Sequence, residues 1–214
     1  MTLARTHFVV LAVALGLPTV LLGQSDSALR APRWFASAWT GVQWGRLHVT
    51  DDASNSRWDF DAAFTMRGTL EREIRPRLAL GVAWSQSRPP LTYQSLTAGA
   101  CGACAADATM TSYGLTVRYG GGRRFYQLYE AFVGVMNFRN FERVSPRGPL
   151  EPRRGSTDPA LGLGVGVGYA IAEDWHVVLI QDNVTVMHER SVQPFAGGRF
   201  ARSYATRLGL RVGF

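Results

Sequence analysis

Apolar residues alternate with small or polar residues along most of the chain, with a period of two. The C-terminal segment shows this pattern most clearly. One of its faces would carry Tyr204, Thr206, Leu208, Leu210, Val212 and Phe214. The opposite face would carry Ser203, Ala205, Arg207, Gly209, Arg211 and Gly213. This alternation predicts a β-strand with an apolar environment on one side and a polar or tightly packed environment on the other.

The same period predicts about eight strands. They cover residues 34–46, 59–71, 78–85, 113–119, 125–138, 161–171, 175–188 and 203–214. In the first strand we expect Trp39 and Gln43 to face inward, and the fifth must turn Glu130 inward. Asp182 lies in the middle of the seventh strand, where it indicates either a β-bulge or a polar site at the edge of the apolar zone.

Short and long connections alternate strictly between these strands. The short ones are 75–77, 120–124 and 172–174, and the long ones are 49–57, 86–110, 139–158 and 189–199. This order is typical of a transmembrane barrel with short periplasmic turns and long external loops, although a soluble barrel of lipocalin type is also compatible with it.

Aromatic residues lie near the strand ends, where they would form two girdles at the membrane interfaces. Ordinary core aromatics of a soluble β-protein are the alternative. The periplasmic girdle would consist of Trp34, Phe35, Tyr119, Phe125, Tyr169, Trp175 and Phe214. The outer girdle would consist of Trp44, Trp58, Trp84, Tyr113, Phe138 and Tyr204.

The N-terminus has the layout of a secretory signal peptide. Arg5 precedes an apolar run from Phe8 to Leu22, and small or polar residues follow it. We predict a signal peptide over residues 1–28, cleaved somewhere in 23–28, and a β-barrel domain over residues 29–214. The apolar run is too short for a good transmembrane anchor and contains Gly16 and Pro18.

The composition agrees with strands rather than helices in a membrane. Apolar residues make up 46% of the 214 residues, and the mean hydropathy is only −0.04, which is too low for a helical membrane protein. The net charge is +7 and every basic residue is Arg. These Arg residues are scattered along the chain rather than concentrated on one face, which argues against nucleic-acid binding.

Strands that cross hydrocarbon must close into a barrel, since each unpaired backbone group there costs several kcal/mol. We therefore predict an all-β, closed, antiparallel, up-and-down barrel with a largely filled interior. Charges that face the lumen are tolerable when they pair. The predicted lumen network consists of Asp59, Asp61, Arg67, Glu71, Arg118, Glu130, Arg207 and Arg211.

The C-terminal strand resembles the closing strand of bacterial outer-membrane proteins. Its apolar positions Tyr204, Leu208, Leu210 and Val212 lead to a terminal Phe214. With the leader, the strand number and the loop alternation, the chain resembles the small barrels of the OmpA, OmpX and OmpW type. This resemblance implies an outer-membrane monomer whose last strand is the assembly signal. Its implied partners are outer-membrane lipids, lipopolysaccharide, the assembly machinery and periplasmic chaperones.

Three sequence features suggest specific chemistry. Cys101 and Cys104 lie in a long loop, where we expect a disulfide rather than a redox or zinc site. The glycine run 162–168 fits an inward strand face better than a nucleotide-binding loop. The third long loop contains Arg residues that are either a solvated surface or a grip for lipopolysaccharide phosphates. They are Arg139, Arg143, Arg147, Arg153 and Arg154.

The leading functional hypothesis is a structural or surface-interacting barrel with no cofactor and no bound metal. The alternative is a narrow channel or a carrier of small apolar molecules. Some barrels that this chain resembles modify lipid A, which requires a nucleophile, a His and an acid in one site. His188, Glu189 and Ser191 are close in sequence, but no His-x-Ser pair is present. We therefore expect no enzymatic activity.

Overall fold

The computed structural model describes residues 33–44, 47–95, 101–122, 124–188 and 200–214. The predicted signal peptide and residues 189–199, including Glu189 and Ser191, lie outside the described residues. The described part contains strands and no helix, so no helix there is long or apolar enough to span a bilayer.

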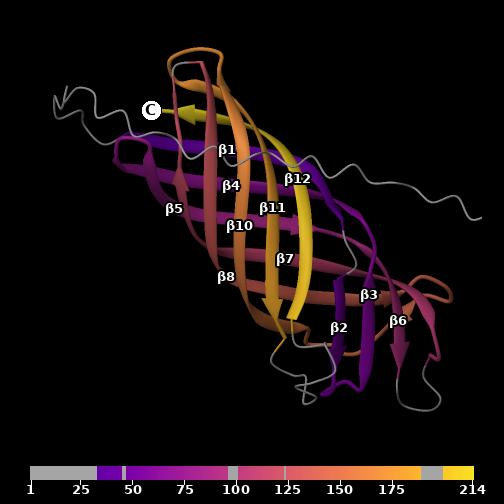
Figure 1. The fold of residues 1–214 in the computed structure, drawn as a ribbon. Coiled ribbons are helices and arrows are strands. Elements are labelled where there is room, and N and C mark those ends of the chain that lie inside the picture. Colours follow the sequence, from indigo (N-terminus) through magenta and orange to yellow (C-terminus); the bar gives the residue numbers. More distant parts are fainter. Residues whose placement is uncertain (1–32, 45–46, 96–100, 123, 189–199) are drawn as a thin grey trace, which may run out of the picture. The chain divides into compact units, whose positions relative to one another are not determined.

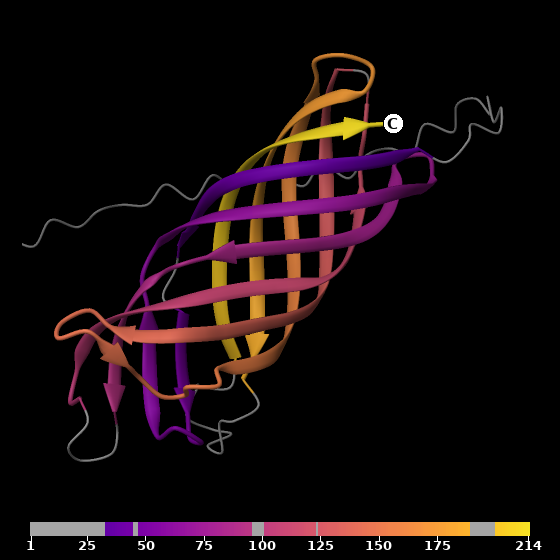
Figure 2. The same cartoon turned by 180° about the vertical axis from the view of Figure 1, so that it is seen from behind.

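Eight long strands form a closed antiparallel barrel (Figures 1 and 2). Their order around the barrel is β7-β5-β4-β1-β12-β11-β10-β8, and the pairing of β7 with β8 closes the ring. The strands are β1 (Trp34–Trp44), β4 (Ala63–Arg75), β5 (Leu78–Ser87), β7 (Cys104–Tyr119), β8 (Phe125–Arg143), β10 (Ser156–Ala170), β11 (Trp175–Met187) and β12 (Phe200–Gly213). Closure satisfies the backbone of every strand on both sides. The prediction of an eight-stranded up-and-down barrel is confirmed.

Four short strands extend one end of the barrel, which we call the extension end. The opposite end, with the tight connections and Phe214, is called the turn end (Figure 1). The short strands are β2 (Leu47–Asp51), β3 (Ser56–Phe60), β6 (Pro90–Ser95) and β9 (Gly148–Pro149). The predicted long connections 49–57 and 86–110 contain parts of these strands. Strands β2, β3, β6 and the start of β7 form a sheet of order β2-β3-β6-β7, because strands that continue past the barrel can pair there and satisfy one another's backbone groups.

The predicted strand 59–71 is wrong at its start. Asp61 and Ala62 are not in a strand, so β3 ends at Phe60 and β4 begins at Ala63. The facing of the side chains changes across this break. Phe60 is fully buried, while Phe64, which has the same sequence parity, is exposed.

Large apolar side chains cover the outer wall of the barrel. Examples on five strands are Phe64, Val82, Leu115, Leu163 and Leu208, all at least half exposed. Most predicted girdle aromatics are also exposed on this wall, at the turn end and at the level of Trp44, Trp84 and Tyr113. Three of them are corrections, because Phe35, Trp58 and Phe138 point inward and are buried.

Inward-facing glycines make room for large side chains in the lumen. A Cβ on Gly168 would lie 2.2 Å from the ring of Tyr126, and one on Gly209 would lie 2.4 Å from the ring of Trp39. Since no carbon can approach another so closely, these rings fill the volume that the glycines leave. The predicted inward glycine face of 162–168 has this structural basis.

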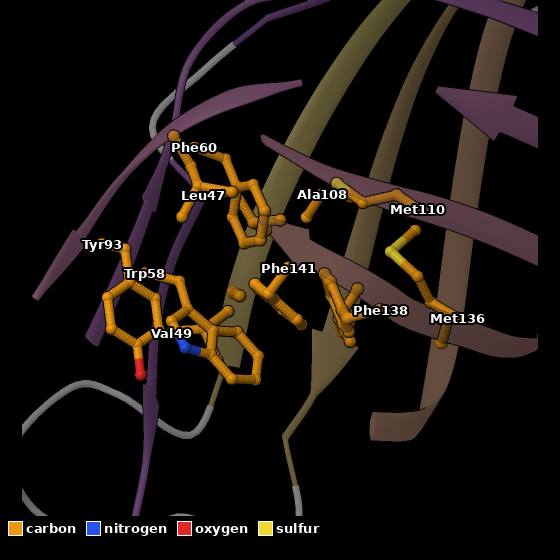
Figure 3. Close-up of a cluster of buried hydrophobic side chains, with 14 of the residues drawn as sticks. Leu47, Val49, Trp58, Phe60, Tyr93, Ala108, Met110, Met136, Phe138 and Phe141 are labelled. Atoms are coloured by element: carbon orange, nitrogen blue, oxygen red, sulfur yellow. The ribbon is translucent and has the colours of Figure 1, made fainter. Parts of the chain in front are cut away.

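An apolar cluster fills the lumen at the extension end (Figure 3). Trp58 is at its centre, with ring centroids 4.5 Å from Phe141 and 5.9 Å from Phe138. The other large members come from β2, β3, β6, β7, β8 and β11: Leu47, Val49, Phe60, Leu91, Tyr93, Met110, Phe132, Met136 and Val186. We call this cluster the apolar layer. It is the hydrophobic core that the extended strands bury.

Candidate functional site: the barrel lumen and the extension end

Seven charged side chains meet in the lumen on the turn-end side of the apolar layer. We call them the charge layer: Arg67, Glu71, Arg118, Glu130, Asp182, Arg207 and Arg211. They come from β4, β7, β8, β11 and β12, and each occupies an inward position of its strand. All seven side chains are at most 9% exposed. At this burial a charge requires a partner.

Glu130 and Glu71 each receive two arginines. Glu130 forms ion pairs with Arg67 and, at 2.7 Å, with the Arg118 Nη2 atom. Glu71 accepts from Arg118 Nη1 at 2.8 Å and from Arg211 Nε at 3.3 Å, and the Thr69 hydroxyl donates to it at 2.9 Å. Arg118 thus connects the two glutamates across the lumen. Such charge-assisted bonds hold the strands in one arrangement.

Asp182 belongs to the charge layer, an orientation that its own strand sequence does not decide. Strand β11 pairs with β10 and β12 without a register shift, so no bulge is present. His176, Val178, Ile180 and Asp182 therefore share the inward face, and all four are buried. Asp182 forms ion pairs with Arg207 and with Arg67, whose Nη1 atom is 3.5 Å away.

Two residues of the predicted lumen network lie elsewhere. Asp59 is partly exposed on β3 and forms ion pairs with His48 and Arg57. Asp61 is exposed in the break between β3 and β4. Placing them in the lumen is wrong, because the break ends the alternation on which that placement depended.

Aromatic rings complete the charge layer. The guanidinium of Arg118 lies 5.0 Å from the ring centroid of Trp39, and that of Arg211 lies 3.4 Å from that of Phe35. Guanidinium groups often stack on aromatic rings, because the ring face attracts a cation and because a guanidinium is weakly hydrated and loses little by leaving water. Together with the apolar layer, the charge layer occupies the described lumen with buried side chains.

A second polar group lies beside the apolar layer, and sequence reasoning missed it. His188, which directly follows β11, is fully buried between two carboxylates. Its Nδ1 atom is 2.8 Å from Asp158 on β10, and its Nε2 atom is 3.5 Å from Asp51 on β2. The Ser156 hydroxyl donates to Asp158 at 2.9 Å, and the Ser54 hydroxyl donates to Asp51 at 2.6 Å. These bonds join the β2–β3 hairpin to the barrel wall.

The two carboxylates stabilise the protonated form of His188. Although burial alone lowers the pKa of an imidazole, the bonds and charges of Asp158 and Asp51 outweigh it and raise the pKa from 6.5 to about 9. His188 is therefore an imidazolium at neutral pH. Both of its ring nitrogens face carboxylates, so it is not placed to activate a serine as a general base.

The predicted loop arginines lie at the extension end, on β8 and on the connection from β8 to β10. Arg139, Arg147, Arg153 and Arg154 are exposed. The Arg143 side chain donates to the Pro146 carbonyl at 2.8 Å, and Arg153 forms an exposed ion pair with Glu151 at 3.3 Å. Cys101 and Cys104 form a disulfide at the start of β7.

The C-terminal strand β12 completes the wall between β1 and β11. Its apolar side chains Leu208, Leu210 and Phe214 are exposed on the outer surface, and Tyr204 and Val212 are partly exposed there. No group of three or more His, Cys, Asp or Glu side chains within the described ranges is arranged to hold a metal ion.

Comparisons with known proteins support the fold. No family model and no curated protein matches the sequence. The crystal structure of Neisserial surface protein A superimposes with a TM-score of 0.55 and 14% identity, over 86% of this chain and 100% of the other. Outer membrane protein OprG from Pseudomonas aeruginosa gives 0.53 and 11%, over 86% and 97%. This chain therefore has the fold of the small eight-stranded outer-membrane β-barrels.

Proposed function

We propose that the protein is a non-conducting barrel of a bacterial outer membrane, with a structural role in the envelope and a surface for interaction at its extension end. The outer wall supports the membrane location. Exposed apolar side chains surround the barrel, whereas a soluble monomer rarely exposes large continuous apolar patches. The fold and the exposed apolar face of β12 agree with a location in that membrane.

The observation that carries the proposal is the double closure of the lumen. The side chains of the charge layer and of the apolar layer are buried at inward positions of the described strands, and we infer that the two layers together close the interior to solutes. The rings of the apolar layer pack against one another, with Trp58 in contact with Phe138 and Phe141, which argues against a cargo molecule among them. A structural and surface role therefore fits better than a channel or a carrier.

Planar-bilayer recording tests this closure. We expect the folded protein to insert without producing steps of ion conductance, because permeation would require breaking several buried ion pairs at once. An open porin inserted under the same conditions is the positive control. Regular conductance steps from the unmodified protein would favour the channel alternative.

The proposed orientation places the turn end in the periplasm and the extension end outside. On that surface we propose an interaction with lipopolysaccharide phosphates through the exposed arginines. The segment 139–158 contains five Arg residues, and its exposed acids are Glu142 and Glu151. Guanidinium groups bind phosphate through paired N–H donors, which makes this surplus of Arg suitable for a phosphorylated lipid.

Charge reversal tests the interaction. A variant with Arg153→Glu and Arg154→Glu should bind purified lipopolysaccharide on the order of thirtyfold more weakly, from about 1 kcal/mol for each basic side chain near an anionic surface. Arg75→Glu with Arg77→Glu at the turn end is the matched control, since both residues are exposed. Equal affinity of the two variants and the unmodified protein would contradict the proposal.

A further inference from the structure

A small cavity separates the two layers of the lumen. Its volume is about 30 Å³, and side chains of the charge layer line one part of it while Met110, Phe132 and Met136 of the apolar layer line another. All eight barrel strands contribute to its wall. We infer that this cavity is a binding site for a small monovalent anion of the halide class.

Hydrogen-bond donors without good acceptors point to this site. Arg207 lines the cavity and is only 5% exposed, and its Nε atom has no hydrogen-bond partner among the described residues. The Gln43 amide is in a similar position. Its oxygen accepts from the Ser87 hydroxyl at 3.0 Å, but its nitrogen faces only the Met110 sulfur at 3.9 Å, a weak acceptor. A buried donor without an acceptor is costly, so a ligand that accepts from both would be stabilising.

The charge of the layer favours an anion over a neutral ligand. The layer contains four arginines and three carboxylates, so its formal net charge is +1, although each arginine contacts at least one carboxylate. Glu130 and Asp182 also line the cavity, but each is already bound by two arginines. Water could accept from Arg207 and Gln43, but it would not offset the charge. A singly charged anion does both.

The volume limits the anion to a small one. About 30 Å³ is room for one or two water-sized particles. Halide ions are of this size, whereas sulfate, phosphate and organic carboxylates exceed it. The Arg207 and Gln43 donors would replace part of the hydration shell of the ion.

The dependence of the folding stability on chloride concentration tests the site in the intact protein. In detergent at constant ionic strength, sodium chloride is exchanged stepwise for the sodium salt of a bulky anion such as gluconate. Above the Kd for chloride, the unfolding equilibrium constant should fall about tenfold for each tenfold rise in chloride, because only the folded state has the site. Arg207→Gln should abolish this dependence. Arg202→Gln, an exposed residue of the same strand, should retain it.

Diffraction gives a test that needs no variant. Crystals of the unmodified protein grown in sodium bromide should show a bromide anomalous peak between Arg207 and Gln43. Two outcomes would overturn the inference: water only in the cavity of bromide-grown crystals, or equal stability in chloride and gluconate.

Discussion

Replacing Glu130 with leucine should lower the free energy of unfolding by about 3–5 kcal/mol, the cost of leaving buried charges without their partner. Glu130 binds both Arg67 and Arg118, and all three side chains are at most 9% exposed. Leucine has nearly the same size but accepts no hydrogen bond. Both arginines would lose a carboxylate in a lumen that already has one surplus positive charge.

Reversible urea unfolding of the protein in lipid or detergent measures this effect. Asp59→Asn is the matched control, because Asp59 is a partly exposed carboxylate whose ion pairs are worth at most about 1 kcal/mol. A double-mutant cycle with Arg118→Met should give a coupling energy of about 1–3 kcal/mol. If Glu130→Leu unfolds at the same urea concentration as the unmodified protein, the charge layer is not a stabilising network.

The second large effect is a loss of stability at alkaline pH that depends on His188. Its pKa is about 9 in the folded state, against 6.5 in an ordinary imidazole. The folded state therefore holds the proton more tightly than the unfolded state. The stabilisation is complete below pH 6.5, decreases as the pH rises, and is lost above about pH 9. At about 1.4 kcal/mol for each pKa unit, its size is on the order of 3–4 kcal/mol.

Measuring the free energy of unfolding between pH 6 and 10 tests this dependence. His188→Asn should be less stable at neutral pH and should lose the decrease between pH 6.5 and 9. His48→Asn is the control and should keep it, since His48 is an exposed residue of the same β2–β3 hairpin. Burial raises the pKa of Tyr93 above 10, so its titration falls outside this window. A pH profile that His188→Asn leaves unchanged would mean that the imidazolium does not hold the hairpin to the barrel.

Much of the barrel could be predicted from local alternation. Within an uninterrupted strand, side chains at every second position share a face. Once the facing of one residue is known, the facing of the other residues in that strand follows. Glu130 illustrates this. If its carboxylate faces inward, the side chains of Leu128 and Phe132 must face inward too, and all three are buried in the structure. Six of the eight predicted lumen charges lie together for the same reason.

The errors have one physical cause. Alternation tells which side of the sheet a residue faces only within an uninterrupted strand, and it cannot be continued across a break. The two residues Asp61 and Ala62 leave the strand, and the chain resumes with the opposite facing. Asp59, which is predicted to face the lumen, is therefore partly exposed, while its neighbour Phe60 is buried. Asp182 could not be oriented from its own strand either, since only the pairing of β11 with β10 and β12 excludes a bulge.

The sequence by itself determined that the chain forms a barrel with an apolar wall and a charged interior, because this information is repeated locally in every strand. Only the tertiary structure decided which charges pair and how the extension end is filled. Asp51, Asp158 and His188 lie far apart in sequence, and no local pattern relates them. They meet because β2, β10 and β11 converge around the apolar layer, and closure of the sheet brings those distant positions together.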